Sequence, residues 1–577
     1  MPMRPAWTPL ATRWLGPWVA DVNRSSLRAD ALAGLVGALI VLPQGIAFAA
    51  LAGLPPAWGL YTSIVPCVVA ALAGSSRLMV SGPSNATSLA LAAMLAPLAV
   101  AGTPGYLQLA LAATLGLGLL QTSLGVLRLG SLANFVSPSV LLGFTTGAAV
   151  LIAWHAAQDL ALAWPEATVG VVTLAAALLS RRWFRSGQHL LLGLLAGGLA
   201  AAGLHGLGWP TAQVGAITGG LPHLSPPPMD AATLQRLLGI AVALTIVSLG
   251  QTMAIGKALA VRNGERFDAN RECLAQGASN IVGSFFSCFV ASGSLNRSVV
   301  NEQAGARTPL AAVASAGIVA VLLLVGGPVL AWIPMAAIAG LLLLVAWSLF
   351  DRSHWQRVIR LDHAEAAIAG GTFAATLLLS LEVAIIGGVT ASLVTYLVRS
   401  AKPALRSMGF DLPPGHRGYR PFVVIDDAPP DALPECPQLK LLRMEGSVYF
   451  GAVAHVADHL HRLRDGPTPQ RHLLVMAKSM TTIDLAGADV WEAERIRRVA
   501  MGGDLYFHRP RPPVVDLWRR SGFLGRLGAD HVFDSKPAAL AGIVARLDPD
   551  ICAGCTARIF AECAGQPGAA KVPDTAA

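Results

Sequence analysis

The chain has 577 residues, of which 54% are hydrophobic and only 13% are Asp, Glu, Lys or Arg, and its formal net charge is +9. Soluble domains carry about 25% charged residues, so this composition excludes an ordinary soluble enzyme, a disordered chain and a disulfide scaffold. Between positions 31 and 120 the only charged residue is Arg77. Apolar runs of this length are typical of a polytopic membrane protein.

Fourteen apolar segments are predicted to form membrane-spanning helices, because a helix needs about 20 apolar residues to cross the hydrocarbon core. The tenth segment is too short to cross alone. The predicted segments are residues 31–52, 57–73, 83–100, 106–127, 137–158, 166–180, 188–205, 234–256, 272–288, 294–303, 309–327, 333–350, 363–380 and 383–399.

Positive charges alternate with these segments along the chain. Lys and Arg collect in every second connection, whereas the long connection 206–233 has none. Since positive loops stay in the cytoplasm, the pattern predicts a bacterial inner-membrane protein whose termini, including the N-terminal segment 1–30, are both cytoplasmic. The residues of the predicted cytoplasmic side are Arg77, Arg128, Arg181, Arg182, Arg185, Lys257, Arg262, Arg266, Arg271, Arg307, Arg352, Arg357, Arg360, Arg399 and Lys402.

The fourteen segments divide into two halves of seven, which an odd number of crossings places in opposite orientations. The third segment of each half opens with small polar residues, Ser81-Gly82-Pro83-Ser84-Asn85 in the first and Ala291-Ser292-Gly293-Ser294-Leu295-Asn296-Arg297 in the second. A helix start carries unpaired N–H groups and about half a positive charge. Two such starts aimed at one point, with Arg297 beside them, predict an anion site at the bilayer midplane. The alternative is two ordinary loops with Arg297 reaching a membrane interface.

The first segment has an interruption of its own at Leu42-Pro43-Gln44-Gly45. Proline removes a backbone donor and kinks a helix. Gln44 then offers amide groups near the kink, and Phe48 offers an apolar wall one turn later. The alternative is a proline kink with an incidental glutamine.

These segments resemble the sulfate permease (SulP) family of anion transporters over most of the chain. The resemblance is carried by residues 30–56, 59–61, 81–84, 143–147, 270–309, 333–334 and 345–347. It implies an all-α polytopic membrane domain over residues 31–400, with 14 spans arranged as two inverted 7-span repeats that form a core and a gate. It also implies a homodimer and an elevator-like movement of the core. The family's anion-site positions correspond here to Gln44, Phe48, Pro83, Ser84, Asn85, Ser294, Asn296 and Arg297.

The chain departs from the family pattern at two positions. Many members carry an acid in the eighth span, where this sequence has Gln251. An amide does not exchange a proton near neutral pH, so cation symport through this coupling position is not expected. In the fifth span a common family glutamine is missing near His155, which we interpret as a packed histidine rather than a pH-sensitive group.

Strands and helices alternate after residue 421. Residues 440–444, 472–476 and 504–507 are predicted strands, and residues 453–463 and 486–500 are predicted helices. The order indicates a small cytoplasmic α/β domain. It is similar to the STAS domain that follows SulP transporters, over residues 421–547. Its loop 484–487 lacks the phosphorylatable serine of bacterial signalling STAS proteins, so we expect a dimerisation, folding or partner-docking module.

The C-terminal tail, residues 548–577, contains Cys552, Cys555 and Cys563. A C-x-x-C pair with a third cysteine could hold zinc or an iron–sulfur cluster. Three thiols fall short of a four-ligand site, which the distant Cys436 or a partner would have to complete. The alternative is reduced cysteines with no metal, and no other cofactor is expected.

The sequence therefore predicts secondary transport of small anions, such as sulfate or bicarbonate, with no bond chemistry and no nucleic-acid partner. One alternative is a nucleobase transporter of the same fold, although the two helix starts lack the acids that would pair with a base. Another is a membrane scaffold or sensor acting through the STAS domain. The expected partners are a small anion, membrane lipid, a second copy of the chain and a cytoplasmic protein at the STAS domain.

Overall fold

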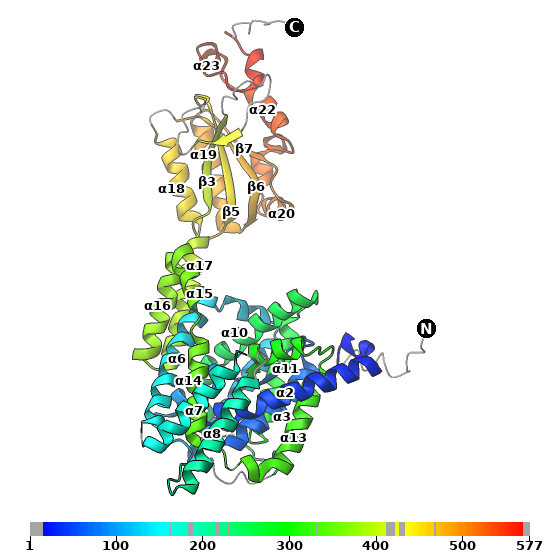
Figure 1. Ribbon diagram of the computed structural model, residues 1–577. Helices are drawn as coiled ribbons and strands as arrows, with labels where there is room; N and C mark the ends of the chain where they lie inside the picture. Colours follow the sequence, from blue (N-terminus) through cyan, green and yellow to red (C-terminus); the bar gives the residue numbers. More distant parts are fainter. Residues whose placement is uncertain are drawn as a thin grey trace, which may run out of the picture. The chain divides into compact units, whose positions relative to one another are not determined.

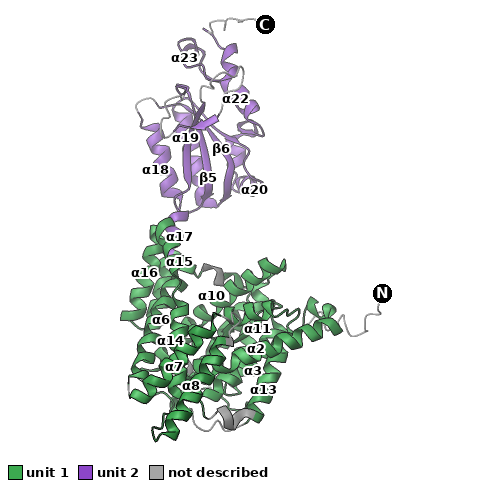
Figure 2. Cartoon of the chain, viewed as in Figure 1, with its two compact units in different colours: residues 1–393 green, residues 394–577 purple. Residues whose placement is uncertain are grey.

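A computed structural model describes residues 15–161, 163–182, 188–213, 220–228, 230–330, 332–410, 422–425, 433–466 and 469–568. The chain divides into two compact units, Met1–Leu393 and Val394–Ala577 (Figure 2). Positions 1–14 of the predicted N-terminal segment and 569–577 of the predicted tail lie outside the described residues.

The first unit is helical, and a helix occupies each of the fourteen predicted segments. The short helix η1 (Pro17–Asp21) precedes them, and η2 (Gly130–Phe135), α9 (Ala231–Arg236) and α15 (Arg352–Leu361) lie in the connections. The helices that match the predictions are α2 (Arg24–Leu51), α3 (Pro56–Ala73), α4 (Asn85–Leu95), α5 (Pro104–Val126), α6 (Pro138–Leu160), α7 (Trp164–Ser180), α8 (Gln188–Gly206), α10 (Leu238–Asn263), α11 (Ala269–Ser284), α12 (Leu295–Gln303), α13 (Leu310–Leu330), α14 (Met335–Leu349), α16 (His363–Leu378) and α17 (Leu381–Ser400).

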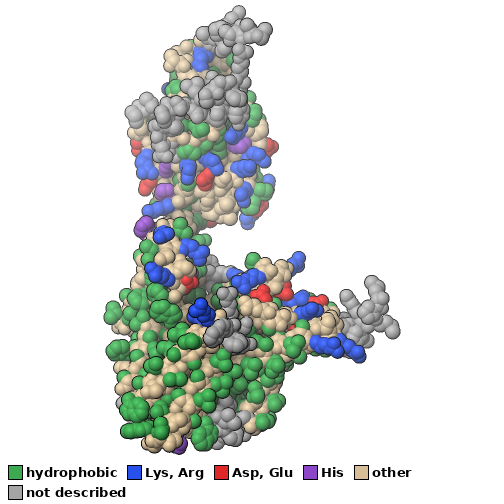
Figure 3. Space-filling model, viewed as in Figure 1, with side chains coloured by type: hydrophobic (Ala, Val, Ile, Leu, Met, Phe, Trp, Pro, Cys, Tyr) green, Lys and Arg blue, Asp and Glu red, His purple; other side chains and the backbone are tan. Residues whose placement is uncertain are grey.

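Within the described residues, eight helices are long and apolar enough to cross a membrane. Three more apolar helices are shorter, Asn85–Leu95, Trp164–Ser180 and Leu310–Val325. The surface agrees with a lipid environment: Figure 3 shows apolar side chains over most of the visible face of this unit, and Trp154, Leu199 and Leu378 are 64%, 75% and 80% exposed. An apolar surface this extensive is unstable in water. The unit is a polytopic membrane domain, and the count of fourteen crossings stays a prediction.

Segments from the two halves of this unit lie side by side. Helix α13 packs along α2 (Figure 1), and α11 packs along α5. Helices α2 and α3 cross closely at Gly45 and Gly59. A Cβ on Gly59 would lie 1.9 Å from the Gly45 carbonyl oxygen, so only glycine fits at this crossing.

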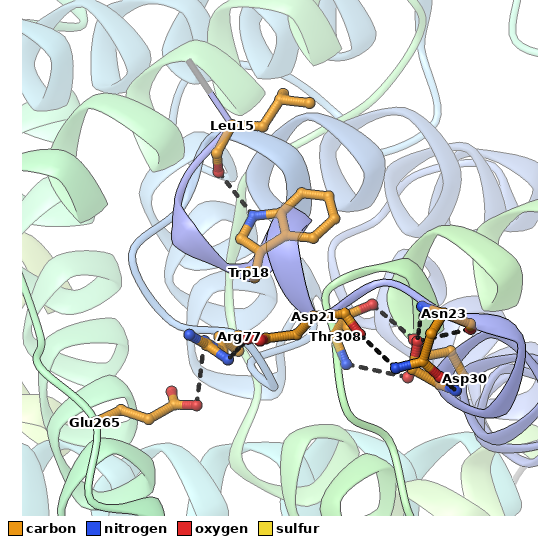
Figure 4. A network of polar contacts seen from close by, with 9 residues as sticks. Leu15, Trp18, Asp21, Asn23, Asp30, Arg77, Glu265 and Thr308 are labelled. Carbon is orange, nitrogen blue, oxygen red and sulfur yellow. Dashed lines mark hydrogen bonds and ion pairs between the residues drawn. The ribbon is translucent and has the colours of Figure 1, made fainter. Parts of the chain in front are cut away.

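A polar network joins the start of α2 to distant loops (Figure 4). Arg77 forms ion pairs with Asp21 at 2.6 Å and with Glu265 at 3.4 Å. Asp30, which is only 1% exposed, accepts hydrogen bonds from the backbone N–H groups of Arg307 at 2.7 Å and Thr308 at 3.1 Å, and from the Thr308 hydroxyl at 2.6 Å. The single buried carboxylate of this network therefore ties α2 to the turn before α13.

The second unit is built on a six-stranded sheet with the order β4-β3-β5-β6-β7-β8. Strand β3 is antiparallel to β4 and β5, and β5 to β8 are parallel. The strands are β3 (Ala404–Phe410), β4 (Phe422–Val424), β5 (Leu439–Val448), β6 (His472–Ile483), β7 (Leu505–His508) and β8 (Val532–Phe533). The helices are α18 (Val453–Arg464), α19 (Leu485–Ala500), α20 (Pro512–Arg520), α21 (Phe523–Leu527), η3 (Ala529–His531), α22 (Lys536–Val544), α23 (Pro549–Ala553) and η4 (Ala561–Gly565).

Adjacent strand residues of this sheet fill two cores. Val475 and Phe507 belong to one cluster with Trp491 of α19, whereas their neighbours Leu474 and Tyr506 belong to a cluster on the opposite face. This alternation follows from the two-residue period of a strand. The predicted strands and helices and the α/β class are thus confirmed.

The unit also extends beyond the predicted 421–547 in both directions. Strand β3 starts at Ala404, which pairs with Glu445 of β5. Leu405, Ser407 and Met408 are buried along this strand. On the C-terminal side, Cys552, Ile559 and Phe560 are buried in the second cluster. The described part of the predicted tail is therefore a packed layer of the domain.

Replacing Asp30 by alanine should strongly destabilise the membrane unit, because it leaves buried donors of the 307–308 turn without an acceptor. The expected loss is about 3 kcal/mol. Asp351→Ala is the matched control: Asp351 caps α15 through the His354 N–H at 2.9 Å but is exposed, and losing such a cap costs about 1 kcal/mol. Thermal denaturation in detergent measures both, and equal shifts would contradict the role given to Asp30.

Candidate functional site

A short antiparallel ladder lies at the start of two helices. Strand β1 (Ser81–Pro83) pairs with β2 (Ala291–Gly293), with Ser81 opposite Gly293 and Pro83 opposite Ala291. Helix α4 begins directly after β1, and helix α12 begins directly after β2. The ladder therefore brings together the N-terminal ends of two helices that are far apart in the sequence.

Serines occupy the cap positions of both helices. The Ser84 hydroxyl accepts from the Thr87 N–H, receives a hydrogen bond from the Ser292 hydroxyl at 3.0 Å and donates to Gln251 Oε1 at 3.4 Å. Ser294 caps α12 through its backbone, with no side-chain cap bond. Since neither cap residue is a carboxylate, the positive ends of the two helix dipoles are not neutralised at the caps.

Arg297, in the first turn of α12, is only 4% exposed. Its Nη2 donates to the Pro83 carbonyl oxygen at 2.7 Å. Its Nε and Nη1 are buried and have no hydrogen-bond partner among the described residues. A guanidinium buried with free donors is costly unless a negative group completes it.

Gly82 leaves room for this guanidinium. A Cβ at Gly82 would lie 2.7 Å from Arg297 Nη1, and the backbone has φ +151° there. The absence of a side chain at this position lets the arginine lie directly against the strand.

Buried polar side chains hold the ladder from behind. The Gly293 N–H donates to the Thr252 hydroxyl at 3.0 Å. Asn280 accepts from the Ala291 N–H at 2.8 Å and donates to Gln121 at 3.1 Å. These groups, from α5, α10 and α11, satisfy backbone that lipid could not.

The other predicted binding residues differ in position. Gln44 and Phe48 are 8% and 6% exposed on α2, which packs against β1, α4 and α12. Asn85 is half-buried and accepts from its neighbour's N–H at 2.8 Å. Asn296 is exposed, because the first turn of α12 turns it away from the buried side occupied by Arg297.

The structure thus gathers Pro83, Ser84, Gln251 and Arg297 around one point. It adds Ser292 and Thr252, which the sequence does not single out as ligands. Thr252 directly follows the coupling position, and Ser292 lies in the interrupted start, so both positions carried a weak signal. In the fifth span the interpretation of His155 as packed is wrong: it is exposed, with Nδ1 2.8 Å from the Leu151 carbonyl oxygen.

The cysteines predicted as metal ligands lie in the second unit, with Cys552 buried and Cys555 and Cys563 half-buried. In the part of the chain that the structure describes, no group of three or more His, Cys, Asp or Glu is placed to hold a metal ion. In the first unit, two helix N-termini whose caps carry no carboxylate lie with hydroxyl and amide groups and a buried cation, and this arrangement suits a small anion.

Comparison with known protein families also supports an anion site. The profile of the sulfate permease family matches residues 27–162 and 160–372. A probable sulfate transporter of Mycobacterium tuberculosis is 30% identical over 548 residues, which are 90% of this chain and 96% of the relative. A probable sulfate transporter of Arabidopsis thaliana is 27% identical over 553 residues, covering 89% of this chain and 86% of the relative.

Solved structures share the fold. Murine solute carrier 26 family member A9, an anion transporter in an inward-facing state, aligns with a TM-score of 0.79 at 20% identity over 94% of this chain and 96% of its own. The transmembrane domain of a cyanobacterial bicarbonate transporter aligns with a TM-score of 0.57 at 23% identity over 64% of this chain and 98% of its own.

Adding a methyl group at Gly82 should displace Arg297 and weaken anion binding at least tenfold, a loss of about 1.4 kcal/mol. Gly102→Ala is the control, because Gly102 has φ +78° but nothing within 4 Å of its Cβ position. Anion affinity is measured from the rise in denaturation temperature with anion concentration. Unchanged affinity in Gly82→Ala would show that the guanidinium position does not matter.

Proposed function

The chain belongs to the sulfate permease family of membrane anion transporters, and on this premise we propose that it is a secondary transporter of small oxyanions such as sulfate or bicarbonate. Sulfate is the first candidate because the named relatives are probable sulfate transporters. Bicarbonate is the second, since a bicarbonate transporter shares the fold. The relatives are transporters and not enzymes.

One observation carries the proposal: the buried Arg297 lies beside two helix starts, and two of its donor atoms have no partner among the residues that the structure describes. These two donors lie on different edges of the guanidinium, so an oxyanion would accept a charge-assisted hydrogen bond from one of them. Ser84 adds a hydroxyl, and the dipoles of α4 and α12 add about half a charge each. We expect Gln44 and Phe48 to line the site from α2, and Asn85 and Ser294 to contribute at the two helix starts.

The protein's neutral coupling position sets its mode of transport. Gln251 Oε1 lies 3.4 Å from the Ser84 hydroxyl, so this side chain is next to the anion site. The Gln251 amide neither exchanges a proton near neutral pH nor carries a negative charge, so it cannot couple anion transport to a proton or another cation. We expect anion exchange or uniport through an elevator-like movement of the core, not symport with a cation at this position.

We also expect the cellular location, the type of second unit and the oligomeric state that are typical of the family. The inner membrane of a bacterium is the expected location, with both termini and the second unit in the cytoplasm, because Lys and Arg of the connections favour that side. The α/β unit is taken as a STAS domain. Its helix α19 begins with Asp484 as cap and Leu485 and Ala486 after it, without a hydroxyl for phosphorylation. A homodimer is expected.

A radiolabelled anion panel in proteoliposomes tests the proposal. Wild-type protein should take up sulfate or bicarbonate, and Arg297→Met should reduce uptake at least tenfold, because a hydrogen bond to a charged group contributes about 1.5–3 kcal/mol. Arg236→Met, at an exposed arginine of α9, should leave uptake unchanged. Failure of the wild-type protein to move any anion would favour the scaffold alternative, and uptake of nucleobases alone would favour the other.

Replacing Gln251 by glutamate should make uptake pH-dependent. A protonated glutamic acid adds no charge to the site, whereas its carboxylate repels the anion, so uptake should fall as pH rises through the titration of the new group. Gln108→Glu introduces the same charge at an exposed position of α5. Identical pH profiles of all three proteins would remove position 251 from the coupling pathway.

A further inference from the structure

Helix α15, which connects α14 to α16, has a one-sided charge. Its ten residues, Arg352–Leu361, include three arginines and one histidine but no Asp or Glu. None of them is buried. The helices around it are apolar, and Figure 1 shows α15 at the end of the membrane unit where α17 leads on to β3. A short basic helix at the end of an apolar unit is a candidate for contact with the membrane surface.

One side of α15 packs on neighbouring helices. Trp355 and Val358 are half-buried, and α15 contacts α16 and α6. The Trp355 indole N–H donates to the Thr146 hydroxyl of α6 at 2.9 Å. The Trp355 ring also meets Phe373 of α16 edge-on, with the ring centroids 6.4 Å apart. Because these contacts attach α15 through one face, they determine which residues the helix turns outward.

The three arginines lie on the outward face. At about 100° a residue, Arg352, Arg357 and Arg360 fall within about 140° of one another, on the side opposite Trp355 and Val358. All three are exposed. Among the residues that the structure describes, none of the three has an ion-pair or hydrogen-bond partner for its side chain. The helix therefore presents three uncompensated positive charges on one face.

The acidic residues at the two ends of α15 are engaged as helix caps. The Asp351 carboxylate accepts from the His354 N–H at 2.9 Å at the start of α15. The Asp362 carboxylate accepts from the N–H groups of Ala364 at 3.0 Å and Glu365 at 3.2 Å, at the start of α16. Neither carboxylate forms an ion pair with an arginine of α15, so the positive face is open to a ligand from outside.

Exposed apolar side chains flank the arginine face. Ile359 and Leu361 of α15 are 53% and 77% exposed, and Trp347 and Phe350 at the end of α14 are 76% and 51% exposed. Tryptophan is enriched where the hydrocarbon core meets the headgroups. At that level apolar side chains enter the acyl layer, while arginines reach the polar layer above it. The composition of this surface therefore fits the boundary between acyl chains and headgroups.

We propose that α15 binds the headgroups of anionic phospholipids in the adjacent membrane leaflet through Arg352, Arg357 and Arg360. Guanidinium groups form charge-assisted hydrogen bonds with phosphate oxygens. The exposed apolar residues favour a lipid over a free phosphate ion, because only a lipid brings acyl chains to cover them. Since α15 is attached to α6 and α16, bound lipid holds these helices at a fixed level in the bilayer. The inference rests on the membrane placement of the first unit and not on the proposed transport.

A lipid titration of the full-length protein in detergent tests this proposal. The denaturation temperature is followed as phosphatidylglycerol is added, with phosphatidylcholine of the same acyl chains and inorganic phosphate in separate titrations. Phosphatidylglycerol should stabilise the wild-type protein at a lower concentration than phosphatidylcholine does. Replacing the three arginines together, Arg352→Gln, Arg357→Gln and Arg360→Gln, should raise the concentration of phosphatidylglycerol that gives half of the shift at least tenfold. The phosphatidylcholine and phosphate titrations should stay unchanged.

Two further variants control for total charge and for folding. Arg462→Gln, Arg519→Gln and Arg520→Gln together remove the same charge from exposed positions of the second unit and should keep the wild-type response. Arg360→Gln alone should weaken the response to phosphatidylglycerol about fivefold, as expected for one basic residue near an anionic surface. This single variant tests the proposal even if the triple variant of α15 does not fold.

Four results would overturn the proposal. The first is a wild-type protein that responds equally to phosphatidylglycerol and phosphatidylcholine. The second is an unchanged response in the folded α15 variants, and the third is an equal loss in the variant of the second unit. The fourth is a weaker response of the α15 variants to inorganic phosphate, which would assign the helix to free anions. Since anion uptake is not measured, the outcome is independent of the proposed transport.

Discussion

The arrangement of the candidate site in the membrane unit depends on one buried guanidinium, that of Arg297, which has more hydrogen-bond donors than partners among the described residues. The hydrogen bond from Arg297 Nη2 to the Pro83 carbonyl oxygen fixes the first turn of α12 against the strand that precedes α4. Gly82 provides the space for this contact, and Nε and Nη1 have no hydrogen-bond partner in the described part of the chain. Removing an arginine from water costs several kcal/mol when no charge compensates it. Under the proposed function, part of this cost is recovered when a bound anion supplies the missing charge.

The polar side chains of helix α11 are explained by their contacts with the β1–β2 ladder. Within a unit of apolar helices, α11 carries Glu272, Gln276 and Asn280, all buried. Glu272 accepts from the Ser75 N–H at 2.9 Å and from Gln276 at 3.0 Å, and Gln276 also donates to the Ser81 hydroxyl at 2.8 Å. Non-helical backbone survives at membrane depth only where protein groups satisfy it. The polar side chains of α11 are therefore part of the support of the ladder, and not separate functional groups.

Sequence reasoning located the helices and the interrupted starts because both leave local signals: apolar length for α2 or α10, and small capping residues at Ser84 and Ser294. It did not predict β1 and β2, since strands of three residues carry no periodicity. It also placed Asn296 with Arg297 although adjacent residues of a helix face different directions, and it treated His155 as packed. In the second unit, Cys436 and Cys552 of the tail are buried in one hydrophobic cluster. This packing depends on how the tail folds back against the sheet, which no local sequence pattern shows.

The β1–β2 ladder limits how this protein can change shape. Its backbone hydrogen bonds join the third helical segment of one half to that of the other, in register from Ser81 to Pro83. A rocker-switch motion, in which the two halves part along their boundary, would break these bonds in a medium that offers no replacements. In the proposed elevator-like movement, both helix starts therefore belong to the same rigid body, and the sliding interface lies elsewhere in the unit.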